Sequence, residues 1–340
     1  MIQPPSLKAA LKRGALVTAA NWPLVVVQFV AEGTLKLLLA VPVVGGIFLV
    51  VLLLGANVED VLAGDVREIV TAVFSALAAN PFALAAFALA FLLVLAGGSA
   101  LTFVTKGGTV SILAEAEAGA GPIERPPLRL EALRRANLTN IDPFLDGCRR
   151  LWRRYVRLGA CLLVVYILTA SAYLGFVVGG YRLSGSLGLI LGWTVAAAIA
   201  SSVLVVWITL VNFFYLLTQM VMAVEDIGVR AAVRRVRDFI RTSLREVAGI
   251  FGVVLLLVVL ATAASILATA GLSLIAFVPL VGLAVLPLQA AAWLIRGIVF
   301  EYLALTALGA YLAQYRHYQH SHEAAPGRDA TLDVPGIRSA

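Results

Sequence analysis

Residues 187–246 read LGLILGWTVAAAIASSVLVVWITLVNFFYLLTQMVMAVEDIGVRAAVRRVRDFIRTSLRE, an apolar run followed directly by an arginine-rich run. Positions 187–224 carry no charged side chain, and positions 225–246 carry six arginines. A helix that crosses the roughly 30 Å hydrocarbon core of a bilayer needs about 20 apolar residues. The apolar run is therefore typical of a transmembrane helix, and the arginines that follow it are typical of a membrane boundary.

The same pattern extends along the whole chain. Apolar residues make up 61% of the 340 positions and charged residues only 13%, which excludes an ordinary soluble domain. We predict an all-α polytopic membrane helix bundle with six transmembrane spans. They cover Trp22–Gly55, Phe82–Val104, Leu158–Gly180, Leu187–Val224, Val247–Gly271 and Leu272–Tyr315. Prolines predict a break near Pro42 and a broken or re-entrant piece over Leu272–Leu288.

Charge alternates between the predicted loops, and this alternation sets the orientation. Lysine and arginine gather at residues 8–13, 106–157, 225–246 and 316, whereas the 56–80 connection is mostly acidic. Basic residues mark the cytoplasmic side of short loops. We therefore expect a multi-pass protein of the cell inner (cytoplasmic) membrane with both termini in the cytoplasm. Residues 1–316 form one membrane domain with a cytoplasmic connection at 105–157, and residues 317–340 a disordered cytoplasmic tail.

Two arginine-rich segments have amphipathic helical patterns. One arginine stripe comprises Arg230, Arg234, Arg237 and Arg241, and the other Arg149, Arg153 and Arg157. We predict interfacial helices whose arginines face anionic lipid phosphates and whose apolar sides face acyl chains. An ordinary interfacial anchor, a specific headgroup site and a docking site for a cytoplasmic partner remain alternatives. Nucleic acid is not an expected partner.

A basic amphipathic segment precedes three predicted hairpins of two spans, starting near residues 6, 144 and 229. This order favours a threefold repeat of an interfacial helix followed by a helical hairpin. Hairpins inserted independently under the same charge rule would give the same order, so both interpretations stay open.

The stretch VEDIGVRAAVRRV at 224–236 lies between two predicted spans. It resembles the membrane domain fused to some bacterial glycerophosphodiester phosphodiesterases, and related six-span bacterial membrane proteins. The matching positions are Glu225, Gly228, Ala232 and Arg235, and Val236 stands where that family often has serine. The resemblance implies a six-span helical fold in contact with lipids. Nothing in the chain is similar to the phosphodiesterase catalytic barrel, so no catalytic residue carries over.

Ionisable residues inside predicted spans are the strongest candidates for a functional site, because charge is costly in hydrocarbon. Glu32 and Lys36 share one face of the first span, and Arg296 and Glu301 lie in the last. We predict that these groups meet across the two helices and line a polar cavity. Ion pairs that only fix the register of the helices are the alternative.

Nucleophile-elbow, phosphate-loop, zinc-protease and dinucleotide-binding motifs are missing. We therefore expect no enzymatic activity, no cofactor and no metal. The sequence favours a protein that binds or translocates a lipid or other amphiphile through a polar-lined intramembrane cleft. A structural or accessory subunit of a larger membrane complex is the alternative.

Overall fold

The structure is a computed structural model that describes residues 6–54, 79–127, 130–187, 189–276 and 281–323. Every secondary-structure element in these ranges is an α-helix, which confirms the predicted class. They are α1 (Leu7–Ala20), α2 (Trp22–Leu54), α5 (Pro81–Gly119), α6 (Leu130–Ala136), α7 (Ile141–Leu187), α8 (Ile190–Glu225), α9 (Val229–Thr242), α10 (Leu244–Ala276) and α11 (Val281–Glu323). Six of the described helices are long and apolar enough to cross a membrane, as predicted.

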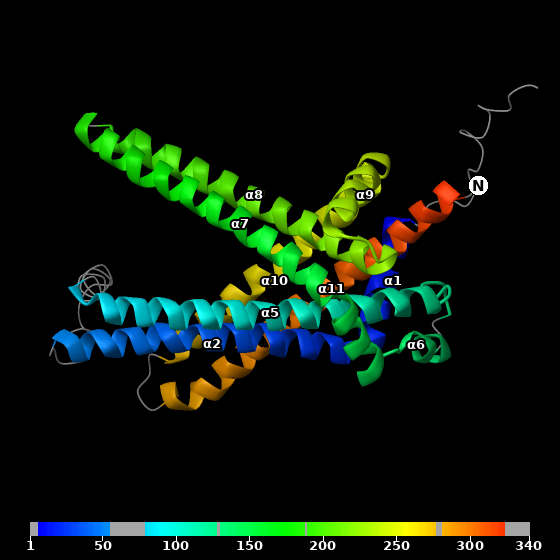
Figure 1. The fold of residues 1–340 in the computed structure, drawn as a ribbon. Helices are drawn as coiled ribbons and strands as arrows, with labels where there is room; N and C mark the ends of the chain where they lie inside the picture. Colours follow the sequence, from blue (N-terminus) through cyan, green and yellow to red (C-terminus); the bar gives the residue numbers. More distant parts are fainter. Residues whose placement is uncertain (1–5, 55–78, 128–129, 188, 277–280, 324–340) are drawn as a thin grey trace, which may run out of the picture.

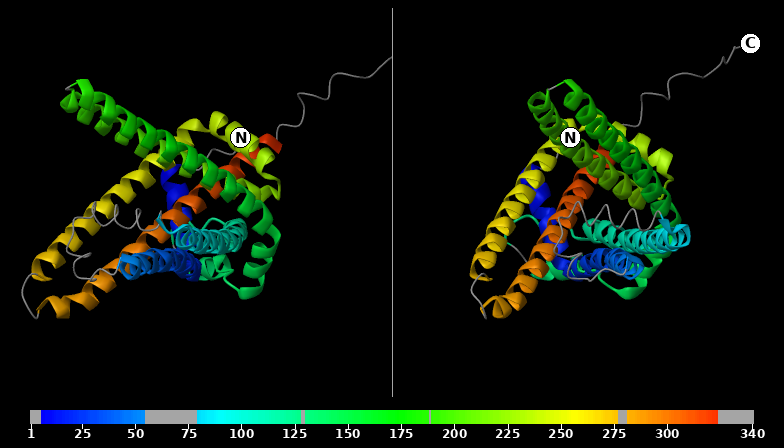
Figure 2. Two further views of the ribbon diagram at one scale, coloured as in Figure 1. Left: turned by 60° about the vertical axis from the view of Figure 1, so that its left-hand side comes forward. Right: turned by 90° about the vertical axis from the view of Figure 1, so that its left-hand side faces the viewer.

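The six long helices pair as three hairpins, α2 with α5, α7 with α8, and α10 with α11 (Figure 1). The hairpins converge at one end of the molecule and point in different directions at the other (Figure 2). We call the diverging parts the arms. The α1 helix precedes the first hairpin and α9 the last, whereas the basic segment of the middle unit is the first part of α7 itself, so the threefold repeat stays a hypothesis.

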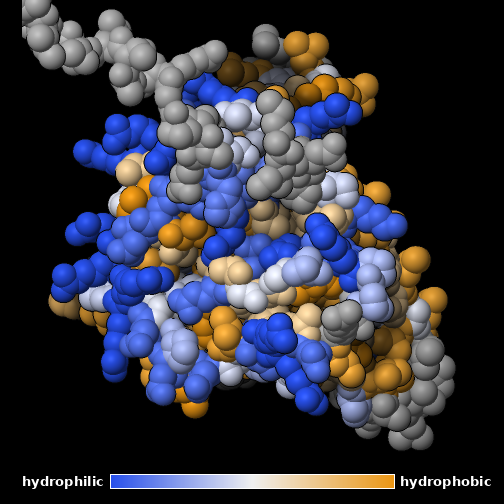
Figure 3. Space-filling model, turned by 90° about the vertical axis from the view of Figure 1, so that its right-hand side faces the viewer, coloured by the Kyte–Doolittle hydropathy of each residue, from blue (hydrophilic) through white to orange (hydrophobic). Residues whose placement is uncertain are grey.

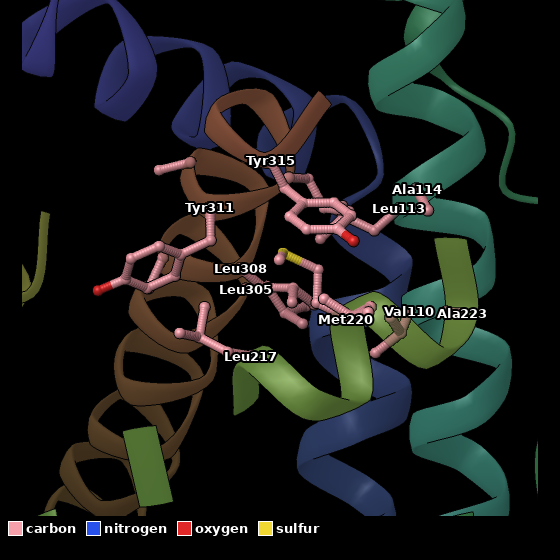
Figure 4. Packing of buried hydrophobic residues seen from close by; sticks show 14 of the residues in the cluster. Val110, Leu113, Ala114, Leu217, Met220, Ala223, Leu305, Leu308, Tyr311 and Tyr315 are labelled. Carbon is pink, nitrogen blue, oxygen red and sulfur yellow. The ribbon is translucent and has the colours of Figure 1, made fainter. Parts of the chain in front are cut away.

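Burial is concentrated where the hairpins converge, and we call this cluster of buried residues the core (Figure 4). Its side chains include Val17 of α1, Leu113 of α5, Leu151 and Tyr155 of α7, Met220 of α8, Phe239 of α9 and Tyr315 of α11. In the most apolar 18 residues of α7 and of α8, by contrast, no residue is buried by protein. Apolar arms of this kind are stable in lipid rather than in water.

Close backbone contact holds α1 against α11 in the core. A Cβ atom on Gly14 would lie 2.4 Å from the carbonyl oxygen of Thr306 and 2.6 Å from the amide nitrogen of Ala310. Only glycine fits there. At the end of α1 the buried Asn21 side chain donates to the carbonyl of Ala136 at 2.7 Å and accepts from the amide of Leu138 at 3.0 Å. These bonds fix the joint between α1 and α2.

Several predicted boundaries are wrong because the helices are longer than the spans. The α2 helix continues through Pro42, and α5 continues past Val104 into the predicted cytoplasmic connection. The Leu272–Leu288 stretch is divided between the end of α10 and the start of α11, so its described residues belong to the two helices of a hairpin and not to a re-entrant piece. Residues 317–323, predicted to belong to the tail, are helical. The rest of that tail and residues 55–78 lie outside the described ranges.

Candidate intramembrane binding site

Side chains from three helices line an open, charged cavity of about 420 Å³ at the crossing of α2 and the α10/α11 arm. The α2 helix contributes Glu32 and Lys36, which are one helical turn apart, and α11 contributes Arg296 and Glu301. Thr262 of α10 completes the polar lining. The structure thus brings together all four residues that the sequence analysis singled out inside the spans.

A glycine and two aromatic rings determine how closely α2 approaches α11 beside this cavity. A Cβ atom on Gly297 would lie 2.1 Å from the ring of Phe29, so the missing side chain makes room for that ring. Phe29 also meets Trp293 edge to face, with 6.0 Å between the ring centroids. These contacts between apolar residues position the charged groups on either side.

Lys106 of α5 is a member of the charged cluster that the sequence analysis missed. Its Nζ atom lies 3.1 Å from one carboxylate oxygen of Glu32, and the Nζ atom of Lys36 lies 3.9 Å from the other. Lys106 directly follows the predicted second span and was assigned to the cytoplasmic connection. Its position at the end of an apolar run was the only signal, and that position is equally typical of a membrane boundary.

A second cavity of about 630 Å³ lies between α10 and α11 and is mostly apolar. Ala261, Ala264 and Ala268 of α10 line it, and Ser265 and Thr269 add hydroxyl groups. Trp293, Arg296 and Phe300 line both this apolar cavity and the charged one. The two cavities therefore adjoin, with Arg296 at their boundary.

The position of Arg296 along α11 places it deep in the arm. The core residues of α11 begin at Leu305, nine residues later, which corresponds to about 14 Å of helix. Taking the edge of the core as the membrane boundary, Arg296 lies near the middle of a hydrocarbon layer of about 30 Å. Insertion scales assign a cost of about 2.5–3.5 kcal/mol to an arginine at that depth.

The seven predicted headgroup arginines lie on the surface of the core end, away from the intramembrane cavity. Arg149, Arg153 and Arg157 of α7 are exposed, and so are Arg230, Arg234, Arg237 and Arg241 of α9. The space-filling view of this end shows hydrophilic side chains over most of its surface, with apolar ones toward the edges (Figure 3). The arginine stripes are therefore free to meet lipid phosphates or water.

The prediction that the opposite, apolar faces of these segments lie against acyl chains is wrong for their central residues. Val236 and Phe239 of α9 and Leu151 and Tyr155 of α7 are fully buried in the core. The Phe239 ring meets the ring of Tyr315 at 5.1 Å between centroids. These residues contact protein rather than acyl chains, because the ends of α5, α8 and α11 occupy the space beside them. Trp152 of α7 and Val233 of α9, on the same faces, stay exposed.

A buried carboxylate in the core was also missed. Glu117 of α5 is 3% exposed and pairs with Arg13 of α1 at 2.8 Å and with Arg316 of α11 at 2.7 Å. Arg13 also pairs with Glu124 at 3.0 Å. This network joins the first, middle and last parts of the chain and has the properties of a structural ion pair.

The motif that carries the family resemblance forms the joint between α8 and α9. Glu225 accepts hydrogen bonds from the Tyr315 hydroxyl, from Gln319 at 3.1 Å and from Arg235 at 3.3 Å. The charge of Glu225 raises the pKa of the Arg235 guanidinium above its ordinary value. Asp226, with a φ of 52°, turns the chain in the left-handed region and accepts from Arg154 at 2.7 Å. The motif thus has a structural role in this chain.

Within the described residues, no group of three or more His, Cys, Asp or Glu side chains is placed to hold a metal ion.

Comparison with known proteins identifies no relative of this chain. No family model, curated protein or solved structure matches the chain, so the resemblance to the phosphodiesterase-associated membrane domain stays a prediction.

Proposed function

We propose that this protein binds or translocates a lipid or another amphiphile through the cavity between α2 and the α10/α11 arm. The observation that carries this proposal is the shared wall of Trp293, Arg296 and Phe300, which joins a charged cavity to an apolar one. An amphiphile has the same two parts, a polar head and an apolar tail. The Glu32 carboxylate pairs with Lys36 and Lys106 rather than with a nucleophile, which supports a binding role without a chemical step.

For this role we place the core on the cytoplasmic side of the bacterial inner membrane. The α1 helix and the C-terminal part of α11 pack together at the core end, so the first and last described helices share one side. The exposed arginines of α7 and α9 surround the same end, which agrees with the positive-inside rule. Anionic lipids are then the expected neighbours of these arginines.

A role as an accessory subunit of a membrane complex is the second candidate, and the α7/α8 arm favours it. No residue in the most apolar part of either helix is buried by protein, and three side-chain hydrogen bonds connect the two helices. An arm that is stabilised internally can present its outer surface to another membrane protein as well as to lipid.

One purification experiment separates the two candidates. Gly33 lines the charged cavity and a Cβ atom on it meets nothing within 4 Å, so Gly33→Phe places an aromatic ring at the cavity without a clash at the Cβ position. Gly252→Phe is the matched control, since Gly252 is equally unobstructed on an exposed part of α10. Each variant is purified in mild detergent, its native mass recorded, and its bound amphiphiles extracted and identified.

We expect the natural chain and Gly252→Phe to retain an amphiphile that Gly33→Phe loses. Equal retention by all three proteins would contradict binding in the cavity. Stoichiometric co-purification of an unrelated membrane protein, without any amphiphile specific to the cavity, would favour the accessory role instead.

A further inference from the structure

The charged cluster around the cavity has more cationic than acidic side chains. Three cations, Lys36, Lys106 and Arg296, surround two carboxyl groups, those of Glu32 and Glu301. Two carboxyl groups carry at most two negative charges, so at least one positive charge is not balanced. An uncompensated charge has a high free energy where water is scarce, and binding an anion lowers that free energy.

Arg296 is the cation of this cluster that has no ion-pair partner in the described part of the chain. Both lysines lie within 4 Å of a Glu32 carboxylate oxygen, whereas Arg296 makes no ion pair with any other described residue. Its guanidinium instead lies over the Phe300 ring, with 5.7 Å from the guanidinium carbon to the ring centroid. That contact leaves the N–H groups at the edge of the guanidinium available to a ligand.

We infer that the ligand is an amphiphile with one anionic head, a carboxylate or phosphate, which binds Arg296 while its apolar tail lies between α10 and α11. This inference rests on the proposed function and narrows it to one class of ligand. The planar guanidinium suits two oxygens of one head group better than an ammonium ligand or an uncharged one.

The wall opposite Arg296 fits the tail of such a ligand. Ala261, Ala264 and Ala268 follow one another at three- and four-residue intervals on α10, and their small side chains leave the apolar cavity open. Ser265, Thr269 and Gln289 add hydrogen-bonding groups to the wall. Both α10 and α11 also have exposed apolar residues such as Leu260 and Ile295, so a ligand can enter from the lipid.

Fluorescence quenching tests this inference, because Trp293 lines both cavities. The protein is placed in nanodiscs of uncharged phosphatidylcholine and titrated with dibrominated stearic acid, with its methyl ester, or with dibrominated phosphatidylglycerol. Bromine quenches tryptophan only at short range, and the quenching that Trp293→Phe removes reports the site. The acid and the phospholipid arms distinguish a carboxylate from a phosphate head.

Three arginine variants test the role of the charge. We expect Arg296→Gln to weaken saturable quenching by the anionic probe by about tenfold or more, because it removes a charged hydrogen-bond donor. Arg296→Lys is expected to retain a large part of the affinity. Arg182→Gln, on an exposed part of α7 outside both cavities, is the matched control and should bind like the natural chain.

The outcomes separate this inference from the proposed function. Equal saturable quenching by the acid and its methyl ester, unaffected by Arg296→Gln, would overturn the anionic head while leaving amphiphile binding in place. Quenching at Trp293 that never saturates with any probe would overturn both. Loss of binding in Arg296→Gln and Arg296→Lys, with helical content unchanged by circular dichroism, would support a requirement for guanidinium geometry.

Discussion

The Nζ atom of Lys106 lies 3.1 Å from a carboxylate oxygen of Glu32, and this ion pair connects α5 to α2 four residues before the core residue Val110. Both side chains are about three-quarters shielded from solvent by the protein alone. The ion pair therefore lies at the boundary between the core and the arms. Its position makes it relevant both to stability and to the charge of the neighbouring cavity.

We expect Glu32 and Lys106 to be energetically coupled. Glu32→Gln leaves Lys106 without its partner, whereas Lys106→Met in the same background removes the remaining charge and restores part of the stability. A double-mutant cycle in detergent should give a coupling free energy of about 1 kcal/mol or more. Purely additive effects of the two substitutions would show that the pair contributes nothing to folding.

Gly14→Ala is expected to destabilise the core strongly. Its methyl group would meet the backbone of Thr306 and Ala310, which cannot move without separating α1 from α11. Overpacking of this kind costs about 1–3 kcal/mol, and a lower thermal unfolding midpoint in detergent would reveal it. Gly252→Ala is the control, because nothing lies within 4 Å of its new methyl group. Equal midpoints for the two variants would contradict the close contact.

Glu117→Gln should be among the most damaging single charge changes in the core. It leaves two arginines, Arg13 and Arg316, facing a neutral amide at a site that is 3% exposed. Breaking a buried pair in this way costs about 3–5 kcal/mol in free energy of unfolding. The nearby Glu115 is exposed, and Glu115→Gln should change stability by about 0.5 kcal/mol or less. A tolerant Glu117→Gln would mean that the network is not structural.

The orientation of the chain can be tested with two cysteines. Cys148→Ala with Cys161→Ala removes the native thiols, and Arg182→Cys and Arg237→Cys are then made separately. We expect a membrane-impermeant maleimide to label position 182 in intact cells, because it lies at the far end of an arm. Position 237, on α9 at the core end, should react only after the membrane is opened. Labelling of both positions from outside would overturn the orientation.

Hydropathy and charge were sufficient to predict the helical class and the candidate spans. Long apolar runs have few alternatives in a bilayer, so 187–224 could be assigned from its composition alone. The meeting of Glu32 with Arg296 and Glu301 also followed from their positions, because charged groups inside spans are expected to find one another. These predictions depend on solvation, which is a property of local sequence.

The parts that sequence analysis missed depend on packing between distant helices. The buried faces at Val236 and Leu151 have the same periodic pattern whether they meet protein or acyl chains. Lys106 and Glu117 looked like residues of a cytoplasmic connection, because nothing local shows that α5 continues straight to Gly119. Pro287 suggested a broken helix, but α11 continues through it, and a proline inside a helix has the same local sequence pattern as one at a break.

The α7/α8 arm has a mechanical consequence for the joint that carries it. From Leu158 to Leu187 the α7 helix extends for roughly 44 Å, with its support at one end only. By this lever, a tilt of about 10° at the base displaces the tip by about 8 Å. A helix tilts when the bilayer around it becomes thinner or thicker. A change in bilayer thickness is therefore expected to bend the chain at the base of α7, where Arg154 is bonded to Asp226. Together with the hydrogen bond from the Tyr155 hydroxyl to the Gln219 carbonyl at 2.8 Å, this ion pair is where we expect a tilt of the arm to reach α8 and the α8–α9 turn.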